Sequence, residues 1–338
     1  MKVYKLDKPG SVDGLAIHEV DKPSPGNGEI LLRVRATSIN NRDLLVVRDQ
    51  YGFPIPPGLV PLSDAAGEVE AIGAGVRRFK VGDRVAPAMQ IGWIGGRARP
   101  EYFGTDLGGS LDGVLSQYVV VPAESAVHLP PHLSFEEAAT LNCAGVTAWA
   151  ALNEPYPIGP GETVLVQGSG GVALFGLQLA KAMGARVIAL TSSEAKAQRL
   201  RALGADEVIN YRSVPDWDQV ARSLTGNQGV DRVIETGGPA TIAKSLSSLR
   251  IGGQISLIGF SGGMQGASLD PVSLIGRAIR IETIAVGSRM HFEDMNRLIA
   301  AARIRPVVDR VFPFDEAAKA LVYLESRRHI GKIVIAVP

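Results

Sequence analysis

The stretch of residues 161–205 constrains the fold more than any other part of the chain. It opens with a short apolar, β-branched run at Thr163–Gln167, which is typical of a buried strand. Gly168-Ser-Gly-Gly-Val172 then predicts a sharp turn, and the apolar run over residues 173–183 suits a helix buried against a sheet. Residues 186–190 predict the next strand. Together these elements predict a βαβ unit.

The small residues of this turn have the spacing of a dinucleotide site. The first glycine permits the tight turn, the second lets a pyrophosphate approach the main chain, and the third small residue lets the helix pack on the strand. Gly168, Gly170 and Ala173 stand at these positions. The helix that follows offers free N–H groups and a partial positive charge. We expect a dinucleotide to contact Gly168, Gly170, Gly171 and Val172; a glycine-rich turn in another kind of α/β protein is the alternative.

The end of the second strand indicates which dinucleotide binds. An NAD site usually has an acidic residue there for the ribose 2′-OH, whereas this chain has Thr191 and Ser192. Lys196 follows in the next helix, and Tyr211 ends the third strand. Hydroxyls and a cation suit a 2′-phosphate, because each charge-assisted hydrogen bond contributes roughly 1.5–3 kcal/mol. We therefore expect NADP(H), although the carboxylate of Glu194 argues against it. The alternative makes Lys196 a solvated residue and Ser192 a helix N-cap.

Size and composition limit the class of protein. The chain has 338 residues, of which 46% are hydrophobic, and can bury a large core, which favours two domains. A formal charge of +1 gives no support for nucleic acid or an anionic membrane as partner. We expect no membrane span and no signal peptide, since the chain opens with strand-like Met-Lys-Val-Tyr. A single cysteine excludes an internal disulfide and suits the cytoplasm.

The sequence pattern of the chain changes after about residue 125. Before it, short β-type runs separated by Pro and Gly (30–36, 66–72, 84–87 and 116–121) predict a mostly antiparallel β domain. The long Gly-rich loop at residues 89–113 forms either a wall over the substrate or a contact with a neighbouring subunit. From residue 135 a helical pattern leads into alternating strands and helices, which predict a doubly wound sheet. A last strand at residues 280–286 could pair across a homodimer axis.

This layout resembles the medium-chain dehydrogenase/reductase superfamily over essentially the whole chain. The resemblance is carried by Glu29-Ile-Leu-Leu-Arg-Val-Arg-Ala36, residues 61–67, Val81-Gly-Asp-Arg-Val85, the turn at residues 168–172 and Gly331-Lys-Ile-Val334. It implies a GroES-like β-rich domain made of residues 1–128 and 291–338, and a Rossmann domain with a doubly wound parallel sheet at residues 129–290. It also implies that the C-terminal strand returns to the first domain.

The resemblance raises the question of a catalytic zinc ion. Similar zinc alcohol dehydrogenases have a Cys-His pair, then Gly-His-Glu, then a second cysteine. The matching positions here are Asn40 and Asn41, residues 62–64, and Cys143. Only Cys143 and Asp64 could ligate a metal, whereas a catalytic zinc needs three protein ligands. We predict no metal, and we expect Cys143 to be a small buried group, with a nucleophile as the alternative.

The predicted absence of a metal ion limits which acceptors the enzyme can reduce. Without a Lewis acid, an alkoxide loses several kcal/mol of stabilisation, whereas a quinone or enone delocalises the developing charge onto a carbonyl oxygen. The chain is most similar to the zinc-free quinone oxidoreductase and enone reductase branch. That resemblance implies Asn40 near the nicotinamide, Asn41 and Thr147 on the cofactor, and Tyr51 lining the pocket.

Asn40, Tyr51 and Ser63 are the candidates to hold the carbonyl oxygen. Asp64 is either an acid whose pKa is raised by burial or a solvated loop carboxylate.

Further cofactor contacts are expected at the carboxyl ends of strands. Gly237, Gly259 and Phe260 follow predicted strands, where a dinucleotide lies along the sheet edge. The resemblance implies that residues near the nicotinamide carboxamide and near the ribose and phosphates come from the C-terminal third: Val286, Gly287 and Ser288, then Gly331 and Lys332.

Three other functions compete with a quinone or enone reductase. A metal-independent NADP(H) alcohol or ketone oxidoreductase is the first, and a non-catalytic NADPH-binding protein is the second. The third is a serine hydrolase, because Gly259-Phe-Ser-Gly-Gly263 matches a nucleophile pattern and is followed by Asp270 and His291. That nucleophile needs a helix directly after Ser261, which the glycine-rich continuation does not favour.

Overall fold

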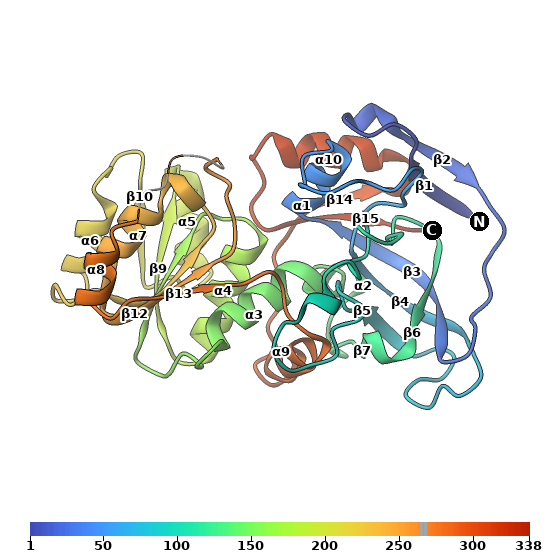
Figure 1. The fold of residues 1–338 in the computed structure, drawn as a ribbon, viewed down its shortest axis with the longest axis horizontal. Helices are drawn as coiled ribbons and strands as arrows, with labels where there is room; N and C mark the ends of the chain where they lie inside the picture. Colours follow the sequence, from blue (N-terminus) through green and yellow to red (C-terminus); the bar gives the residue numbers. More distant parts are fainter. Residues whose placement is uncertain (264–265, 267–268) are drawn as a thin grey trace. The chain divides into compact units, whose positions relative to one another are not determined.

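The computed structural model describes residues 1–263, 266 and 269–338. Contacts divide the chain into a first unit, residues 1–146 and 286–338, and a second unit, residues 147–285 (Figure 1). This division groups residues 129–146 and 286–290 with the first unit, whereas the proposed domain boundaries group them with the Rossmann part. The predicted α/β class, with one β-rich part and one part built on a parallel sheet, is confirmed.

The first unit is built on a largely antiparallel sheet of seven strands. Its order is β14 (Val308–Pro313), β15 (Lys332–Ala336), β3 (Glu29–Ile39), β4 (Asp64–Ile72), β5 (Arg84–Pro87) and β7 (Ala126–His128), with β6 (Tyr118–Pro122) also paired to β3. A separate hairpin joins β1 (Lys2–Leu6) to β2 (Leu15–Glu19). Strand β3 has neighbours on both edges and is buried over most of its length, which explains its apolar sequence.

The C-terminal strand returns to this sheet as expected. Strand β15 pairs antiparallel with β3, with Ile333 opposite Ile39, and Figure 1 shows red β15 beside blue β3. Gly331 precedes β15 with φ +92°, and a Cβ atom there would lie 2.2 Å from the carbonyl oxygen of Val307. Only glycine can make this approach, so the fold itself requires glycine at position 331.

The second unit is a parallel sheet of six strands. Its order is β10 (Glu207–Asn210), β9 (Arg186–Thr191), β8 (Thr163–Gln167), β11 (Val230–Glu235), β12 (Leu249–Leu257) and β13 (Arg280–Thr283). The order runs outward in both directions from β8, so the carboxyl end of β8 lies at the switch point where doubly wound sheets bind ligands. Connecting helices are α4 (Gly171–Ala182), α5 (Glu194–Ala202), α6 (Trp217–Ser223), α7 (Ile242–Ser248) and α8 (Pro271–Gly276).

The predicted helical stretch after residue 135 is not one regular helix. It consists of α2 (Phe135–Ala138), a π-helical turn at Leu141–Gly145 and α3 (Val146–Asn153). The buried Asn142 side chain explains the irregular turn: its Nδ2 donates to the carbonyl oxygens of Ala65 at 3.0 Å and Pro87 at 2.7 Å. These bonds attach the turn to β4 and β5 and so place Cys143.

Three more helices belong to the first unit. They are α1 (Asn41–Val47), α9 (Arg289–Ala301) and α10 (Ala317–Glu325). Buried Leu321 and Leu324 of α10 join the core of this unit. Across the part of the chain that the structure describes, no helix has the length and apolarity needed to cross a bilayer.

Candidate functional site

Three neighbouring strands bring polar side chains together in the first unit. Lys332 is the first residue of β15, Asn40 directly follows β3, and Asp64 is the first residue of β4. The pairing of Ile333 with Ile39, and of Ser38 with Asp64, places these residues at the same end of the three strands. The sheet register therefore assembles one polar cluster from distant parts of the sequence.

The ammonium group of Lys332 is at the centre of this cluster. The residue is 3% exposed, and its Nζ donates to the carbonyl oxygen of Ile39 at 2.9 Å, to Oδ1 of Asn40 and to Oδ2 of Asp64 at 3.2 Å. An ammonium has three protons, so each finds an acceptor. The resemblance implies a place near the cofactor's ribose and phosphates for Lys332; in the structure its ammonium contacts Asn40 and Asp64.

Asp64 is fully buried, so the alternative of a solvated carboxylate is wrong. Its Oδ1 accepts a hydrogen bond from Ser63 Oγ at 3.0 Å, and its Oδ2 accepts one from Ser38 Oγ at 2.9 Å, besides the bond from Lys332. Two hydroxyls and an ammonium thus compensate the charge. Leu62 precedes this pair with φ +70°, an unusual conformation for a leucine and typical of residues beside functional sites.

Asn40 offers the cluster's one unused donor. Its main-chain N–H donates to Asp43 Oδ2 at 2.7 Å, and its Oδ1 accepts from Lys332. Its Nδ2 is buried and has no hydrogen-bond partner among the residues that the structure describes. Buried polar groups without a partner are rare in proteins, so this donor suits a ligand.

Sequence reasoning missed a second buried network centred on Arg42. Its guanidinium donates to Asp43 Oδ1 at 3.1 Å, to Asp106 Oδ2 at 2.6 Å and to the carbonyl oxygen of Leu107 at 3.1 Å. The ring centroid of Tyr51 lies 5.0 Å from Arg42 Cζ, within cation–π range. Tyr51 thereby adjoins the cluster through Arg42, and the loop at residues 89–113 is attached to α1 through Asp106.

Burial shifts two acids of this network. It raises the pKa of Asp43 to about 6, with Arg42 opposing the shift and Asp64 adding to it. Burial also raises the pKa of the Tyr51 hydroxyl, again opposed by Arg42. Tyr51 is therefore a protonated donor at neutral pH.

The donor set does not suit a zinc ion. Cys143 is only half-buried as a residue, yet burial, with a further contribution from the Asp64 charge, raises the pKa of its thiol to about 12. A neutral thiol is a poor nucleophile. The other candidate ligand, Asp64, is already engaged with Lys332. Within the described ranges, no three His, Cys, Asp or Glu side chains are grouped to hold a metal.

The second unit contains the expected glycine turn. Gly168 directly follows β8 with φ +88°, and Gly170 directly precedes α4. A Cβ atom at Gly168 or Gly170 would meet nothing within 4 Å, so the main chain there is open to a ligand. The turn, the free N–H groups of α4 and this open space fit a pyrophosphate. Sequence reasoning missed Gly176, where a Cβ would lie 2.6 Å from Ile234 Cδ1, so helix and sheet pack closely there too.

The residues expected at the adenosine ribose lie at the carboxyl ends of β9 and β10. The N–H of Tyr211 donates to the carbonyl oxygen of Thr191 at 3.0 Å. Ser193, not Ser192, caps α5, since its Oγ accepts from the N–H of Lys196 at 3.4 Å. Ser192 is therefore not the N-cap. Glu194, the residue that argued against a phosphate, pairs with Arg201 at 2.8 Å.

A buried carboxylate that sequence reasoning missed organises the neighbouring turn. Glu235 ends β11 and accepts hydrogen bonds from the N–H groups of Gly237 at 2.7 Å and Gly238 at 2.9 Å. It also accepts from Gln167, Thr241 and Ser245, and is fully buried. Gly237 is thus held at the carboxyl edge of the sheet, beside the end of β8, by side-chain bonds.

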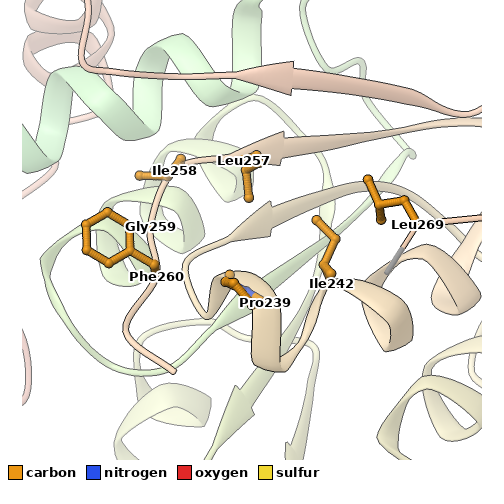
Figure 2. Close-up of a pocket in the computed structure, with 8 residues that line it drawn as sticks. Pro239, Ile242, Leu257, Ile258, Gly259, Phe260 and Leu269 are labelled. Carbon is orange, nitrogen blue, oxygen red and sulfur yellow. The ribbon is translucent and has the colours of Figure 1, made fainter. Parts of the chain in front are cut away.

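Gly259 and Phe260 line a cavity at the carboxyl end of β12. Figure 2 shows this cavity, which has a volume of about 410 Å³ and is lined mainly by apolar side chains, among them Ile242, Leu257 and Leu269. Gly238 also lines it, which connects the cavity to the turn that Glu235 holds. The cavity is apolar and suits an apolar group rather than a phosphate.

The remaining residues expected to contact the cofactor differ in burial. Thr147, Val286, Gly287 and Ser288 are buried, whereas Asn41 is exposed. Ser288 caps α9, since its Oγ accepts from the N–H of His291 at 3.2 Å. The neighbouring Arg289 pairs with Glu124 at 2.8 Å.

For the serine hydrolase alternative, the structure shows one contact of the candidate nucleophile. Ser261 Oγ donates to the carbonyl oxygen of Thr236 at 2.9 Å. Met264 and Gln265, on which the required helix depends, lie outside the described residues.

Comparisons with known proteins show the family of the chain. The alcohol dehydrogenase GroES-like domain model matches residues 26–131, and the zinc-binding dehydrogenase model matches residues 171–301. A zinc-type alcohol dehydrogenase-like protein of Schizosaccharomyces pombe is 41% identical, over 98% of this chain and 97% of that protein. The chain belongs to the medium-chain dehydrogenase/reductase superfamily. The predicted GroES-like and Rossmann parts are thereby confirmed, and the chain is an oxidoreductase of this superfamily.

Other members of the superfamily differ in acceptor and cofactor. Acryloyl-coenzyme A reductase of Metallosphaera sedula is 33% identical, over 96% of this chain and 97% of that protein. A solved structure described as an NAD-dependent alcohol dehydrogenase has a TM-score of 0.91 at 32% identity, with both chains fully covered. A mycobacterial structure described as complexed with NADPH has a TM-score of 0.82 at 27% identity, also with full coverage of both chains.

Proposed function

We propose that this member of the superfamily is an NADP(H)-dependent oxidoreductase that transfers hydride to a conjugated carbonyl acceptor, a quinone or an enone, without a metal ion. The observation that carries the proposal is the cluster of Asn40, Asp64 and Lys332. Where similar zinc enzymes bind a cation through cysteine and histidine, this chain holds a buried ammonium and one unused amide donor.

Residues of the second unit would hold the cofactor. The main chain from Gly168 to Val172 and the N-terminus of α4 would bind its pyrophosphate. Thr191, Ser192, Lys196 and Tyr211 would contact the 2′-phosphate, and the pairing of Glu194 with Arg201 reduces repulsion there. Further proposed contacts are Thr147, Gly237, Gly259 and Phe260 in the second unit, together with Asn41, Val286, Gly287 and Ser288 from the first unit. NADPH, when bound, supplies the hydride.

The first unit would stabilise the charge that this transfer creates. An enone gains hydride at its β-carbon, the C=C bond breaks, and the electron pair moves to the carbonyl oxygen. Asn40 Nδ2 would donate to that oxygen, and Tyr51 would supply a further donor from its protonated hydroxyl. A proton from water completes the saturated ketone, and NADPH is oxidised to NADP⁺. Ser63 is bonded to Asp64, so we assign it to holding that carboxylate.

The amide donor favours a conjugated acceptor over a simple ketone. A neutral hydrogen bond stabilises a delocalised enolate, whereas a localised alkoxide gains several kcal/mol from a Lewis acid that this cluster does not provide. The acryloyl group named for the Metallosphaera relative is itself a C=C bond conjugated to a carbonyl, which supports this class of acceptor.

The test is an assay of NADPH oxidation after dialysis against EDTA. It compares a cyclic enone, a benzoquinone and the saturated ketone of matched size. We expect the enone or quinone to be reduced faster than the ketone, NADPH to be preferred to NADH, and EDTA to change nothing. A faster rate with the ketone, or activity lost with EDTA and restored by zinc, would contradict the proposal. No turnover with any acceptor would favour a non-catalytic NADPH-binding protein.

We also infer a homodimer. Strand β13 is at the edge of the six-stranded sheet, and the adjoining α8 exposes Val272 and Ile275. An open strand edge beside exposed apolar side chains favours pairing with a second copy. Light scattering on the protein in solution would measure its molar mass. A monomer at micromolar concentration would contradict the inference.

A further inference from the structure

We propose that Lys332 is a positioning residue that fixes the orientation of the Asn40 carboxamide, so that its NH₂ group faces the acceptor's carbonyl oxygen. The inference rests on the proposed function, because it assigns the residue that makes Asn40 an effective donor. Its basis is the contact of a buried ammonium with one end of an amide whose other end is unused.

The orientation follows from the types of the two groups. An amide can turn over, exchanging the places of its oxygen and its NH₂. Lys332 Nζ carries only donors, so it can bond Oδ1 of Asn40 but not Nδ2. Turning the amide over would set two donors against each other in the interior, at a cost comparable to a lost buried hydrogen bond. The ammonium therefore holds the NH₂ group away from itself.

The surroundings hold the ammonium in turn. Lys332 is 3% exposed, and its two other contacts, the carbonyl oxygen of Ile39 and the carboxylate of Asp64, belong to β3 and β4. Asp64 is itself fixed by the hydroxyls of Ser38 and Ser63. A rigid set of bonds thus runs from the sheet to the amide, as preorganised sites require.

The ammonium also strengthens the donor. A positive charge at the amide oxygen draws electrons from the nitrogen, so the N–H groups become better donors to a developing negative charge. In this way a fixed cation acts on the acceptor through Asn40. The cation need not touch the acceptor, which distinguishes this arrangement from a Lewis acid that binds the substrate oxygen directly.

The experiment is a double-mutant cycle in the full-length protein. Lys332→Met alone would leave the buried Asp64 carboxylate without a compensating positive charge and could prevent folding. The test variant is therefore Lys332→Met combined with Asp64→Asn, and the second change is Asn40→Ala. The matched control is Arg35→Met combined with Glu68→Gln, which removes a different ion pair of the same sheet, between β3 and β4 at 2.5 Å, outside the cluster.

We expect Asn40→Ala to lower kcat with the enone about 100-fold in the wild-type background, as loss of an oxyanion donor does. Lys332→Met/Asp64→Asn should lower kcat at least about tenfold, with KM for NADPH within about twofold of wild type. When Asn40→Ala is added to the Lys332→Met/Asp64→Asn variant, kcat should fall by less than a further factor of about five. The reason is that the Asn40 donor is already misoriented in that variant. Lys332→Arg should recover part of the rate, and the control pair should remain within about twofold.

Two results would overturn the inference. If the losses multiply in the cycle, Lys332 does not act through Asn40. If KM for NADPH rises while kcat is unchanged, Lys332 serves the cofactor instead. Both can occur while the wild-type enzyme reduces enones, so they leave the proposed function standing. If the wild-type enzyme prefers the saturated ketone, the proposed function itself is wrong, and that result comes from the assay of acceptors.

Discussion

The two units build their candidate sites from different materials. In the second unit the site is mainly main chain, a glycine turn and a helix N-terminus that follow one another within residues 168–172. In the first unit the site is made of side chains, Asn40, Asp64 and Lys332, that are far apart in the sequence and are joined by strand register. A main-chain site depends on the absence of side chains, whereas a side-chain site depends on compensated charge.

The largest effect should come from adding a side chain to the main-chain site. Gly170 has φ −80°, which valine can adopt, and open space where its Cβ would lie. We expect Gly170→Val to leave the melting temperature nearly unchanged but to weaken NADPH binding by about 100-fold or more, because the side chain takes the space of the pyrophosphate. Differential scanning calorimetry measures the melting temperature, and isothermal titration calorimetry measures the affinity for NADPH. Gly170→Ala should have a smaller effect. Unchanged affinity in the valine variant would show that the cofactor does not approach this turn.

The charge network of the first unit should appear in the pH dependence of stability. Burial raises the pKa of Asp43 from 3.8 to about 6, so the folded state binds this proton more tightly than the unfolded state does. The resulting stabilisation is fully present below about pH 4 and is lost as pH rises through 6. It amounts to about 3 kcal/mol, from 1.36 kcal/mol per pKa unit.

Urea unfolding of the wild type and Asp43→Asn from pH 4 to 7 measures this component. Relative to the variant, the wild type should lose stability over the window, because asparagine mimics the protonated acid and does not titrate. A difference between the two proteins that does not vary with pH would show that Asp43 has an ordinary pKa.

One side chain of the second unit should decide between the two dinucleotides. Lys196→Ala should weaken NADPH by about tenfold or more and leave NADH nearly unchanged, because only NADPH carries the 2′-phosphate. Lys181→Ala is the control, since Lys181 is paired with Asp206 at 2.8 Å. Affinities for both cofactors, measured by fluorescence titration, provide the comparison. Equal losses for both would remove the phosphate role of Lys196.

The smallest effect is expected at the cysteine. With its pKa raised to about 12, the Cys143 thiol stays protonated at neutral pH. We expect Cys143→Ala to keep kcat within about threefold, and the wild type to react with a thiol reagent only slowly until it unfolds. A loss of activity near that of Asn40→Ala would instead make Cys143 part of the chemistry.

Much of the second unit could be predicted from the sequence. The periodicity of residues 163–190 predicted two strands and the helix between them, and the turn at Gly168 was recognised from residue types that are consecutive. Glu235 was not recognised, because a carboxylate at a strand end reads as solvated unless its partners are known. Those partners, among them Gln167 and Ser245, come from other elements.

The first unit shows the opposite case. Asn40, Ser63 and Asp64 were identified by their positions in a family pattern, and Lys332 was assigned to the cofactor phosphates. Nothing local to residue 332 indicates that its ammonium meets Asn40, because the two residues are joined only by the pairing of β15 with β3. The Arg42 network was missed for the same reason, since its partner Asp106 is in a loop without a periodic pattern.

The amino-acid sequence by itself therefore determined the superfamily, the parallel sheet with its glycine turn, and which residue types stand where similar zinc enzymes have their ligands. These depend on residue types and short spacings, which are local properties of the chain. The tertiary structure alone decided that Lys332, Asp64 and Asn40 form one buried cluster with a single unused donor. Strand register and burial set which side chains meet and what their charges cost, and both arise only when distant segments pack together.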